Sequence, residues 1–366
     1  MRLSQSIEVK KEQRHKSKII GYSTNRLMGF EVGKCFDDGS WIYCGWLQCI
    51  YPEYIMPFTN QNNTNEFVIM GLISLNTPHI SLFVIFLFIF LVTLTGNVII
   101  LTVVWLDQSL QTPMYFYLTN LSFLEIWYTA TIVPKLLANL LMKYNNISFA
   151  NCMTQLFFFV TFGASECYLL LIMAYDRYLA ICKPLYYHSI MNTRTCLKLV
   201  AGSWIFGVLT GLMPVLLISQ LDFCGSREIN HFFCDIPPLL KLSCSDTYST
   251  EISIFVLSLL VLFCSLMLTL VSYIFIVISI FHIKSSKGRR KTFSTCGAHL
   301  IVVLIYYGTM IFMYVRPHSS YSSDMNKFIS VFYTVVTPGL NPIIYSLRNK
   351  DVKVSLQKLL RRMFHP

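Results

Sequence analysis

An acidic and a basic side chain stand next to each other at the end of an apolar stretch, in the sequence Asp176-Arg177-Tyr178. An arginine at the edge of a membrane is costly unless a partner neutralises its charge. Asp176 can hold Arg177 in a resting state, and a partner protein can replace Asp176 in another. The pair therefore predicts an ion-pair switch, although a static ion pair is the simpler interpretation of the tripeptide alone.

Four cysteines offer disulfide chemistry near one end of the predicted membrane helices. Cys224, Cys234 and Cys244 fall between the fourth and fifth apolar stretches, and Cys152 falls at the start of the third. The extracellular side is oxidising, and four thiols permit three pairings that the sequence leaves open. His231, three residues before Cys234, has a spacing that a soft metal ion could use. Because a disulfide consumes the thiolate, we expect no metal site.

Two carboxyl groups, Glu125 and Glu166, fall inside apolar stretches. An ionisable group at membrane depth normally faces a polar interior, and the expected neighbours of Glu125 are Asn97 and Asn341. Glu125 is either an ion ligand or a protonated structural carboxyl. For Glu166 we expect a buried polar bridge to a neighbouring helix.

Seven stretches that are nearly free of charge must position these residues. The chain has 366 residues, 54% hydrophobic and 13% charged, a composition that belongs in a bilayer. Crossing about 30 Å of hydrocarbon takes roughly 20 apolar residues in a helix, and barrel strands would be shorter and alternating. The fold class predicted is an all-α membrane protein, a seven-transmembrane helix bundle. Its predicted spans are 80–105, 114–134, 151–175, 199–219, 252–281, 292–315 and 328–347.

The distribution of Lys and Arg predicts the orientation. With the N-terminus outside, the inner connections and the C-terminal tail hold fifteen Lys and Arg, against six in the outer loops. Asn62 and Asn146 begin Asn-x-Ser/Thr sequences and then lie outside, as glycosylation requires. The net charge of +11 reflects this bias and attraction to an anionic inner leaflet, so no nucleic-acid partner is expected.

The two ends of the chain differ from the membrane domain. Residues 1–55 are polar and mixed in charge, and they lack the apolar core of a signal peptide. We expect a disordered extension before a natural start at Met56, with a structured extracellular subdomain as the alternative. Residues 56–79 are then the extracellular N-terminus, 80–347 the receptor domain and 348–366 a cytoplasmic tail. The residue pattern of this tail predicts a short amphipathic helix that lies along the inner leaflet and has one apolar face. That face holds Val352, Leu356, Leu359, Leu360 and Met363.

Five segments occur in order, one in each of five predicted spans. They are 113–122 (Pro-Met-Tyr-Phe-Tyr-Leu-Thr-Asn-Leu-Ser), 173–182 (Met-Ala-Tyr-Asp-Arg-Tyr-Leu-Ala-Ile-Cys), Ser272-Tyr273, 291–300 (Lys-Thr-Phe-Ser-Thr-Cys-Gly-Ala-His-Leu) and 338–349 (Pro-Gly-Leu-Asn-Pro-Ile-Ile-Tyr-Ser-Leu-Arg-Asn). Together they resemble the olfactory receptors among the rhodopsin-like G-protein-coupled receptors. The resemblance covers roughly residues 60–362 and looks like the class II, tetrapod-type branch.

This resemblance implies an odorant receptor of the plasma membrane. It would bind small, mostly apolar volatiles in the outer half of the bundle and activate a stimulatory, olfactory-type G protein, raising cAMP. No cofactor and no enzymatic activity are implied. The family's disulfides would map to Cys152 with Cys234 and to Cys224 with Cys244. The activation switch would comprise Asp176, Arg177, Tyr178, Tyr273, Asn341, Pro342 and Tyr345.

The ligand cavity can be placed by counting helical turns back from Arg177. The predicted lining is Phe159, Val160, Gly163 and Ala164 in the third span, Leu257 and Val261 in the fifth, and Tyr307, Met310 and Tyr314 in the sixth. By family resemblance, Tyr314 would be the polar contact and Tyr307 the lever beneath it. Ordinary helix packing explains each of these positions equally well. Such a lining suits a small neutral ligand held by one or two hydrogen bonds.

Other functions fit the sequence less well. An enzyme would need a convergent nucleophile, base or metal cluster, and a transporter more often shows inverted repeats with interrupted helices. The alternative within signalling is a receptor for a peptide or lipid. Such a receptor would be expected to keep a Trp in the sixth span, where this chain has Tyr306-Tyr307-Gly308-Thr309.

Overall fold

The computed structural model describes residues 23–27, 30–37, 40–44, 66–72, 79–142, 145–282, 285–314, 323–348 and 350–364. It divides the chain into two units, Met1–Thr64 and Asn65–Pro366.

The first unit contains an antiparallel sheet where the sequence predicts a disordered extension. Strands β1 (Ser23–Leu27), β2 (Phe30–Asp37) and β3 (Ser40–Cys44) pair in that order. Each pairing closes across two residues, with Leu27 opposite Phe30 and Asp37 opposite Ser40. Short hairpins of this kind are stabilised by β-branched and aromatic residues, which β2 and β3 contain. The rest of residues 1–55 lies outside the described residues.

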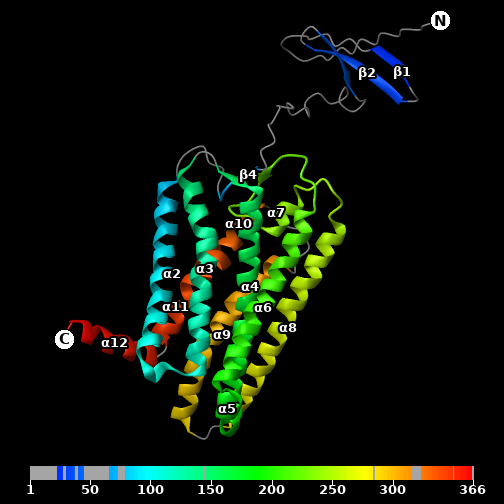
Figure 1. Cartoon of the computed structure of the whole chain (residues 1–366). Helices are drawn as coiled ribbons and strands as arrows, with labels where there is room; N and C mark the ends of the chain where they lie inside the picture. Colours follow the sequence, from blue (N-terminus) through cyan, green and yellow to red (C-terminus); the bar gives the residue numbers. More distant parts are fainter. Residues whose placement is uncertain are drawn as a thin grey trace. The chain divides into compact units, whose positions relative to one another are not determined.

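The second unit is the predicted seven-helix bundle (Figure 1). Within the described residues its helices are α2 (Ile80–Leu106), α3 (Pro113–Leu141), α4 (Phe149–Cys182), α6 (Thr193–Ser219), α8 (Tyr248–Phe281), α9 (Ser286–Tyr314) and a composite seventh helix. That last helix joins α10 (Ser323–Val331), a π-helical turn η3 (Phe332–Val336) and α11 (Thr337–Arg348). By length and composition, the described parts of α2, α4, α6 and α8 are apolar enough to cross a membrane.

Helix α4 is the central element, because it packs against α3, α6 and α8. Its first turn is capped by Ser148, whose hydroxyl accepts a hydrogen bond from the Asn151 amide. We call the end of the bundle near Ser148 the disulfide end, and the end near Arg177, at the other terminus of α4, the Arg177 end.

Two glycines let α6 lie directly against α4. A Cβ atom added at Gly207 would fall 2.9 Å from the Thr161 carbonyl oxygen, and one added at Gly211 would fall 3.0 Å from the Phe157 carbonyl oxygen. Glycines four residues apart share one helix face and permit close backbone approach in membranes. The α4–α6 interface therefore has no room for larger residues at these positions.

A small sheet closes the disulfide end. Strand β4 (Glu66–Ile69) pairs antiparallel with β5 (Asn146–Ser148) and parallel with β6 (Glu228–Ile229). Two side chains of β4, Phe67 and Ile69, are buried. The segment just before the first membrane helix is thus part of the structured bundle.

The Arg177 end carries several short helices. They are η2 (Gln108–Leu110), α5 (Pro184–Ile190) and α12 (Lys350–Phe364). In α12, Val352 and Ser355 are buried and Leu356 and Leu359 are half-buried, so the predicted apolar face contacts the protein in part. Hydrogen bonds from the hydroxyls of Ser355 and Ser109 lower the pKa of Asp107 to about 2. The side chains of Leu360 and Met363 lie outside the described ones.

Candidate functional site

Two disulfide bonds fix the loop between α6 and α8. Cys152, in the first turn of α4, is bonded to Cys234, and Cys224 is bonded to Cys244. The Cα atoms of the two pairs are 5.5 and 5.9 Å apart, an ordinary separation for disulfides. Cys234 also donates its backbone amide to the Gln155 side chain of α4 at 3.0 Å.

The segment around Cys234 forms a lid, which we define as residues 229–236. His231, Phe232, Phe233 and Cys234 in this lid are all buried. The rings of His231 and Phe233 are 4.6 Å apart, and the ring of Phe233 lies 5.0 Å from that of Phe159 on α4. Gly71, just beyond β4, donates its backbone amide to the His231 carbonyl at 3.1 Å. The lid therefore plugs the disulfide end with tightly packed aromatic rings.

A cavity of about 70 Å³ lies beneath the lid, between α4, α6, α8 and α9. Its lining is apolar apart from a few hydroxyl groups and one thiol. The lining residues are Phe159, Val160, Gly163, Ala164, Cys167, Thr210, Ile236, Ser258, Val261, Leu262, Tyr306 and Met310. No charged side chain occurs among these described residues, so the cavity suits a small neutral molecule.

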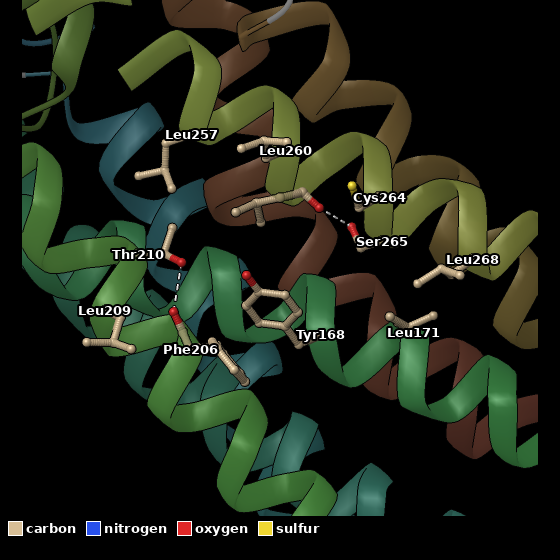
Figure 2. A pocket seen from close by; sticks show the side chains of 11 residues that line it. Tyr168, Leu171, Phe206, Leu209, Thr210, Leu257, Leu260, Cys264, Ser265 and Leu268 are labelled. Atoms are coloured by element: carbon tan, nitrogen blue, oxygen red, sulfur yellow. Dashed lines mark hydrogen bonds between the residues drawn. The ribbon is translucent and has the colours of Figure 1, made fainter. Parts of the chain in front are cut away.

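Six of the residues predicted from sequence line this cavity: Phe159, Val160, Gly163, Ala164, Val261 and Met310. Leu257 instead lines a groove on the outside of α4, α6 and α8 (Figure 2). Tyr314 is the last residue of α9, and its side chain lies outside the described ones. Whether any of these residues binds a ligand stays a prediction.

The cavity contact predicted for Tyr307 of α9 is made instead by its neighbour Tyr306. Tyr306 lines the cavity, and its hydroxyl donates to the Gly163 carbonyl at 2.6 Å. Tyr307, predicted to line the cavity, is buried beside it and donates to the Cys167 carbonyl at 3.3 Å. Tyr306 shares a helix face with Met310, four residues later, and this spacing was the signal available in the sequence.

Sequence reasoning also missed four cavity-lining residues, Cys167, Thr210, Ser258 and Leu262. Predicting them would require the rotation of α4, α6 and α8 relative to one another. Ile236 was missed for another reason, because it belongs to helix α7 (Ile236–Leu240) in the loop. Asp235 caps α7 by accepting from the Ile236 amide at 2.8 Å. The lid thus supplies the wall of the cavity at the disulfide end.

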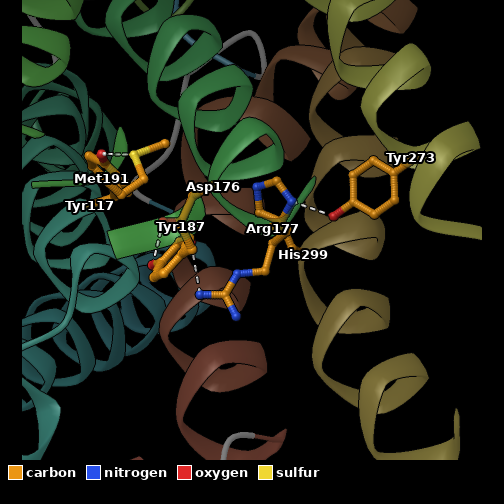
Figure 3. Close-up of polar contacts among 7 residues, drawn as sticks. All are labelled: Tyr117, Asp176, Arg177, Tyr187, Met191, Tyr273 and His299. Carbon is orange, nitrogen blue, oxygen red and sulfur yellow. Dashed lines mark hydrogen bonds and ion pairs between the residues drawn. The ribbon is translucent and has the colours of Figure 1, made fainter. Parts of the chain in front are cut away.

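The predicted ion-pair switch lies at the Arg177 end (Figure 3). Arg177 Nη2 is 3.1 Å from Asp176 Oδ2, and the Asp176 carboxylate is fully buried. Tyr187 of α5 donates its hydroxyl to Asp176 Oδ1 at 2.9 Å. Asp176 therefore contacts both Arg177 and α5, the helix that connects α4 to α6. Because this carboxylate is buried, breaking these contacts would leave its charge unpaired away from water, which is costly.

Tyr273 and Tyr178 lie beside this ion pair. Tyr273 of α8 is hydrogen-bonded to the buried His299 of α9 (Figure 3). The half-buried Tyr178 packs against Phe275, with ring centroids 5.9 Å apart. His299 falls in the 291–300 motif that is visible in the sequence, but its partner Tyr273 could not be identified from that motif.

The seventh helix contributes Asn341 and Pro342. The Asn341 side-chain amide donates to Glu125 Oε1, and both residues are buried. Pro342 packs so close to α2 that a Cβ atom at Gly96 would lie 2.9 Å from its Cβ atom. Glu166 is also buried, and its Oε1 atom has no hydrogen-bond partner in the described structure. The side chain of Tyr345 lies outside the described ones.

Of the two predicted glycosylation sites, Asn146 lies at the disulfide end. Asn146 is exposed in β5, and its side chain donates to Glu66 at 3.1 Å. Asn62 lies outside the described residues. Within the described part of the chain, no group of three His, Cys, Asp or Glu side chains is placed to hold a metal ion.

Comparisons with known proteins agree with this architecture. The family model described as olfactory receptor matches residues 86–363. The chain is 57% identical to human Olfactory receptor 11L1 over 303 residues, which are 83% of this chain and 94% of that protein. It is 50% identical to mouse Olfactory receptor 5AR1 over 82% of this chain and 97% of that protein. It is also 50% identical to human Olfactory receptor 6Q1, over 85% and 99% respectively.

Proposed function

Because this chain belongs to the olfactory receptor family of G-protein-coupled receptors, we propose that its cavity binds a small, mostly apolar volatile and that binding activates a stimulatory, olfactory-type G protein. The resulting signal is a rise in cAMP. Membership of the family already makes the chain an odorant receptor and a multi-pass membrane protein.

The observation that carries the ligand proposal is the chemistry of the cavity wall. Apolar side chains from four helices surround the hydroxyls of Tyr306, Ser258 and Thr210. The Tyr306 hydroxyl donates to the Gly163 carbonyl and accepts from the Cys167 thiol at 3.5 Å, so its oxygen keeps one lone pair for a hydrogen bond from a ligand. An alcohol or another neutral compound with one polar group fits this pattern, whereas an ion would lose its hydration without a compensating charge.

Helix α9 connects the cavity to the ion-pair switch. Tyr306 and Met310 touch the cavity, whereas His299 touches the switch through Tyr273. Seven residues separate His299 from Tyr306, roughly 10 Å along the helix axis. A ligand that binds better when α9 has moved therefore also shifts the equilibrium at Arg177. Release of Arg177 from Asp176 opens a surface for the G-protein α subunit.

In this proposal the disulfide end faces the outside of the cell and the Arg177 end faces the cytoplasm. Disulfides form in oxidising compartments, which supports this orientation. The exposed Asn146 is then available for glycosylation, and α12 lies along the inner leaflet.

A reporter assay tests the proposal. Cells that express the receptor with olfactory chaperones are exposed to a panel of short-chain alcohols, aldehydes, ketones and esters while cAMP is measured. We expect responses in this panel, and Arg177→Ala should abolish them at unchanged surface level. A response that persists in Arg177→Ala would overturn the proposed coupling.

Two further measurements address the ends of the chain. A receptor begun at Met56 should respond like the full chain, because the proposed cavity and ion-pair switch contain no residue from 1–55. Antibodies against tags on the two termini should reach only the N-terminal tag in intact cells. Access to the C-terminal tag would overturn the proposed orientation.

A further inference from the structure

A groove on the outer surface of the bundle runs between α4, α6 and α8, with a volume of about 400 Å³ (Figure 2). Its lining comes from the middle turns of these helices and is mainly leucine and aromatic. The lining residues are Tyr168, Leu171, Phe206, Leu209, Thr210, Leu257, Leu260, Val261, Cys264, Ser265 and Leu268. Since these turns lie at membrane depth, the groove faces the hydrocarbon core of the bilayer.

The groove and the ligand cavity have two lining residues in common, Thr210 of α6 and Val261 of α8. Both side chains are half-exposed, as expected for residues between an outer and an inner space. Helices α6 and α8 each pack on α4 but have few contacts with each other. The wall between the groove and the cavity at this point therefore consists of these two side chains.

Among the described residues, the alternative entrance through the disulfide end is covered by the lid. Phe232, Phe233 and Cys234 of the lid are fully buried, and the disulfide bond to Cys152 ties the lid to α4. Ile236 forms the cavity wall on that side. Entry from water would require the disulfide-linked aromatic rings of the lid to unpack, whereas entry between α6 and α8 meets the side chains of Thr210 and Val261.

We infer that the volatile ligand enters from the bilayer, through the groove and between Thr210 and Val261, into the cavity. This inference rests on the proposed function, because it takes the cavity as the ligand site. A small apolar compound concentrates in the membrane, so the groove meets a higher ligand concentration than the lid does.

Polar groups along the route fit a neutral ligand with a hydroxyl group. Thr210 donates its hydroxyl to the Phe206 carbonyl at 2.7 Å, so its free lone pair can only accept. Ser265 donates to the Val261 carbonyl at 2.5 Å and is likewise left as an acceptor. The Tyr168 hydroxyl points into the groove (Figure 2). The hydroxyl group of an alcohol can donate a hydrogen bond to each of these acceptors in turn. It therefore need not lose all its hydrogen bonds when it leaves water.

Time-resolved photolabelling with a diazirine analogue of butanol, a short-chain alcohol matched to the small cavity, tests the route. The full receptor in lipid nanodiscs is mixed rapidly with this probe, flashed at increasing delays, and its adducts are mapped by mass spectrometry. We expect adducts on groove residues first and on Met310 and Tyr306 later. Leu260→Trp, which fills the groove, should slow the appearance of the cavity adducts severalfold.

The neighbouring Leu259 provides the matched control. It is exposed on α8, as Leu260 is, but does not line the groove, so Leu259→Trp should label the cavity at the wild-type rate. A second pair on α6 guards against a variant that does not fold. Leu209→Trp should slow labelling and Leu212→Trp should not, because only Leu209 lines the groove.

The outcomes separate the route from the ligand site. Cavity labelling at the wild-type rate in both groove variants would overturn the route and leave the cavity as the ligand site. Wild-type receptor that gains no adducts on Met310 or Tyr306 would overturn the cavity as the ligand site, and the route with it. Labelling needs no G protein, so a missing cAMP response would count against the coupling alone.

Discussion

Tyr273 and His299 are joined by a hydrogen bond of 2.5 Å between the Tyr273 hydroxyl and Nδ1 of the imidazole. Both residues are buried, and the bond links α8 to α9 beside the Asp176–Arg177 ion pair (Figure 3). Because α9 also lines the cavity, this bond opposes the movement of α9 that the proposed activation requires.

Removing this bond should raise the basal activity of the receptor. A buried hydrogen bond contributes about 1 kcal/mol net, so Tyr273→Phe should raise ligand-free cAMP roughly fivefold at equal surface level. His299→Leu should act similarly, and the double variant should add little to either. A basal cAMP level below that of the wild type would contradict this role.

Filling the cavity by one methyl group should change ligand preference. At Gly163 an added Cβ atom would lie 3.8 Å from both Met310 Cε and the Tyr306 hydroxyl, so Gly163→Ala fits without a clash. The largest agonists in a homologous series should lose potency roughly tenfold, since overpacking costs about 1–3 kcal/mol, while the smallest keep theirs. Gly308→Ala is the control, because its added methyl meets open space. An equal loss for ligands of every size would contradict the role of the cavity.

Adding the same methyl group at Gly211 should destabilise the bundle. The new Cβ atom would lie 2.2 Å from Thr161 Oγ1 and 3.0 Å from the Phe157 carbonyl oxygen. Gly211→Ala should lower the free energy of unfolding by about 1–3 kcal/mol and reduce thermal stability in detergent. Gly202→Ala, on the same helix with nothing near its Cβ position, should not. Equal melting temperatures for the two variants would show that the α4–α6 contact is not tight.

Acidification should weaken the lid through His231. Burial, together with the nearby Lys327 charge, lowers the pKa of His231 from 6.5 to about 3. Between these pH values the unfolded lid binds a proton and the folded lid does not, so stability falls as pH drops below 6.5. At pH 5 the loss is about 2 kcal/mol.

His231→Gln should flatten this pH dependence, because Gln can still bond Ser330, which lies 3.2 Å from His231 Nε2. Thermal unfolding between pH 7.5 and 5 measures the effect. The exposed His282, changed to Gln, is the control and should keep the wild-type slope. The same slope in His231→Gln would mean that another group carries the acid sensitivity.

The sequence predicted the membrane helices well because a run of apolar residues has few other uses. Their ends were predicted less well. The second span was expected to end at residue 134, but α3 continues to Leu141. Lys135 is accommodated there because its ammonium group donates to the Asn146 carbonyl at 2.8 Å. A charge at the end of a helix thus need not end it.

Helix rotation and local distortion could not be predicted from the sequence. Tyr306 and Tyr307 differ by about 100° around α9, and only the packing on Gly163 decides which of them lines the cavity. The π-helical turn at Phe332–Val336 was not expected either. It precedes Pro338, which has no amide hydrogen to continue the helical ladder, and Thr337 bonds back to Phe332 across five residues.

Strand β4 has a practical consequence for the disulfide end of the receptor. The amides of Val68 and Met70 donate to the Arg227 and Ile229 carbonyls, both at 2.9 Å. The chain before α2 is therefore hydrogen-bonded to the loop that covers the cavity. Proteolytic cleavage just after Glu66 would cut β4 and leave every membrane helix intact. Protection of this bond from a protease therefore reports that β4 is paired with the lid.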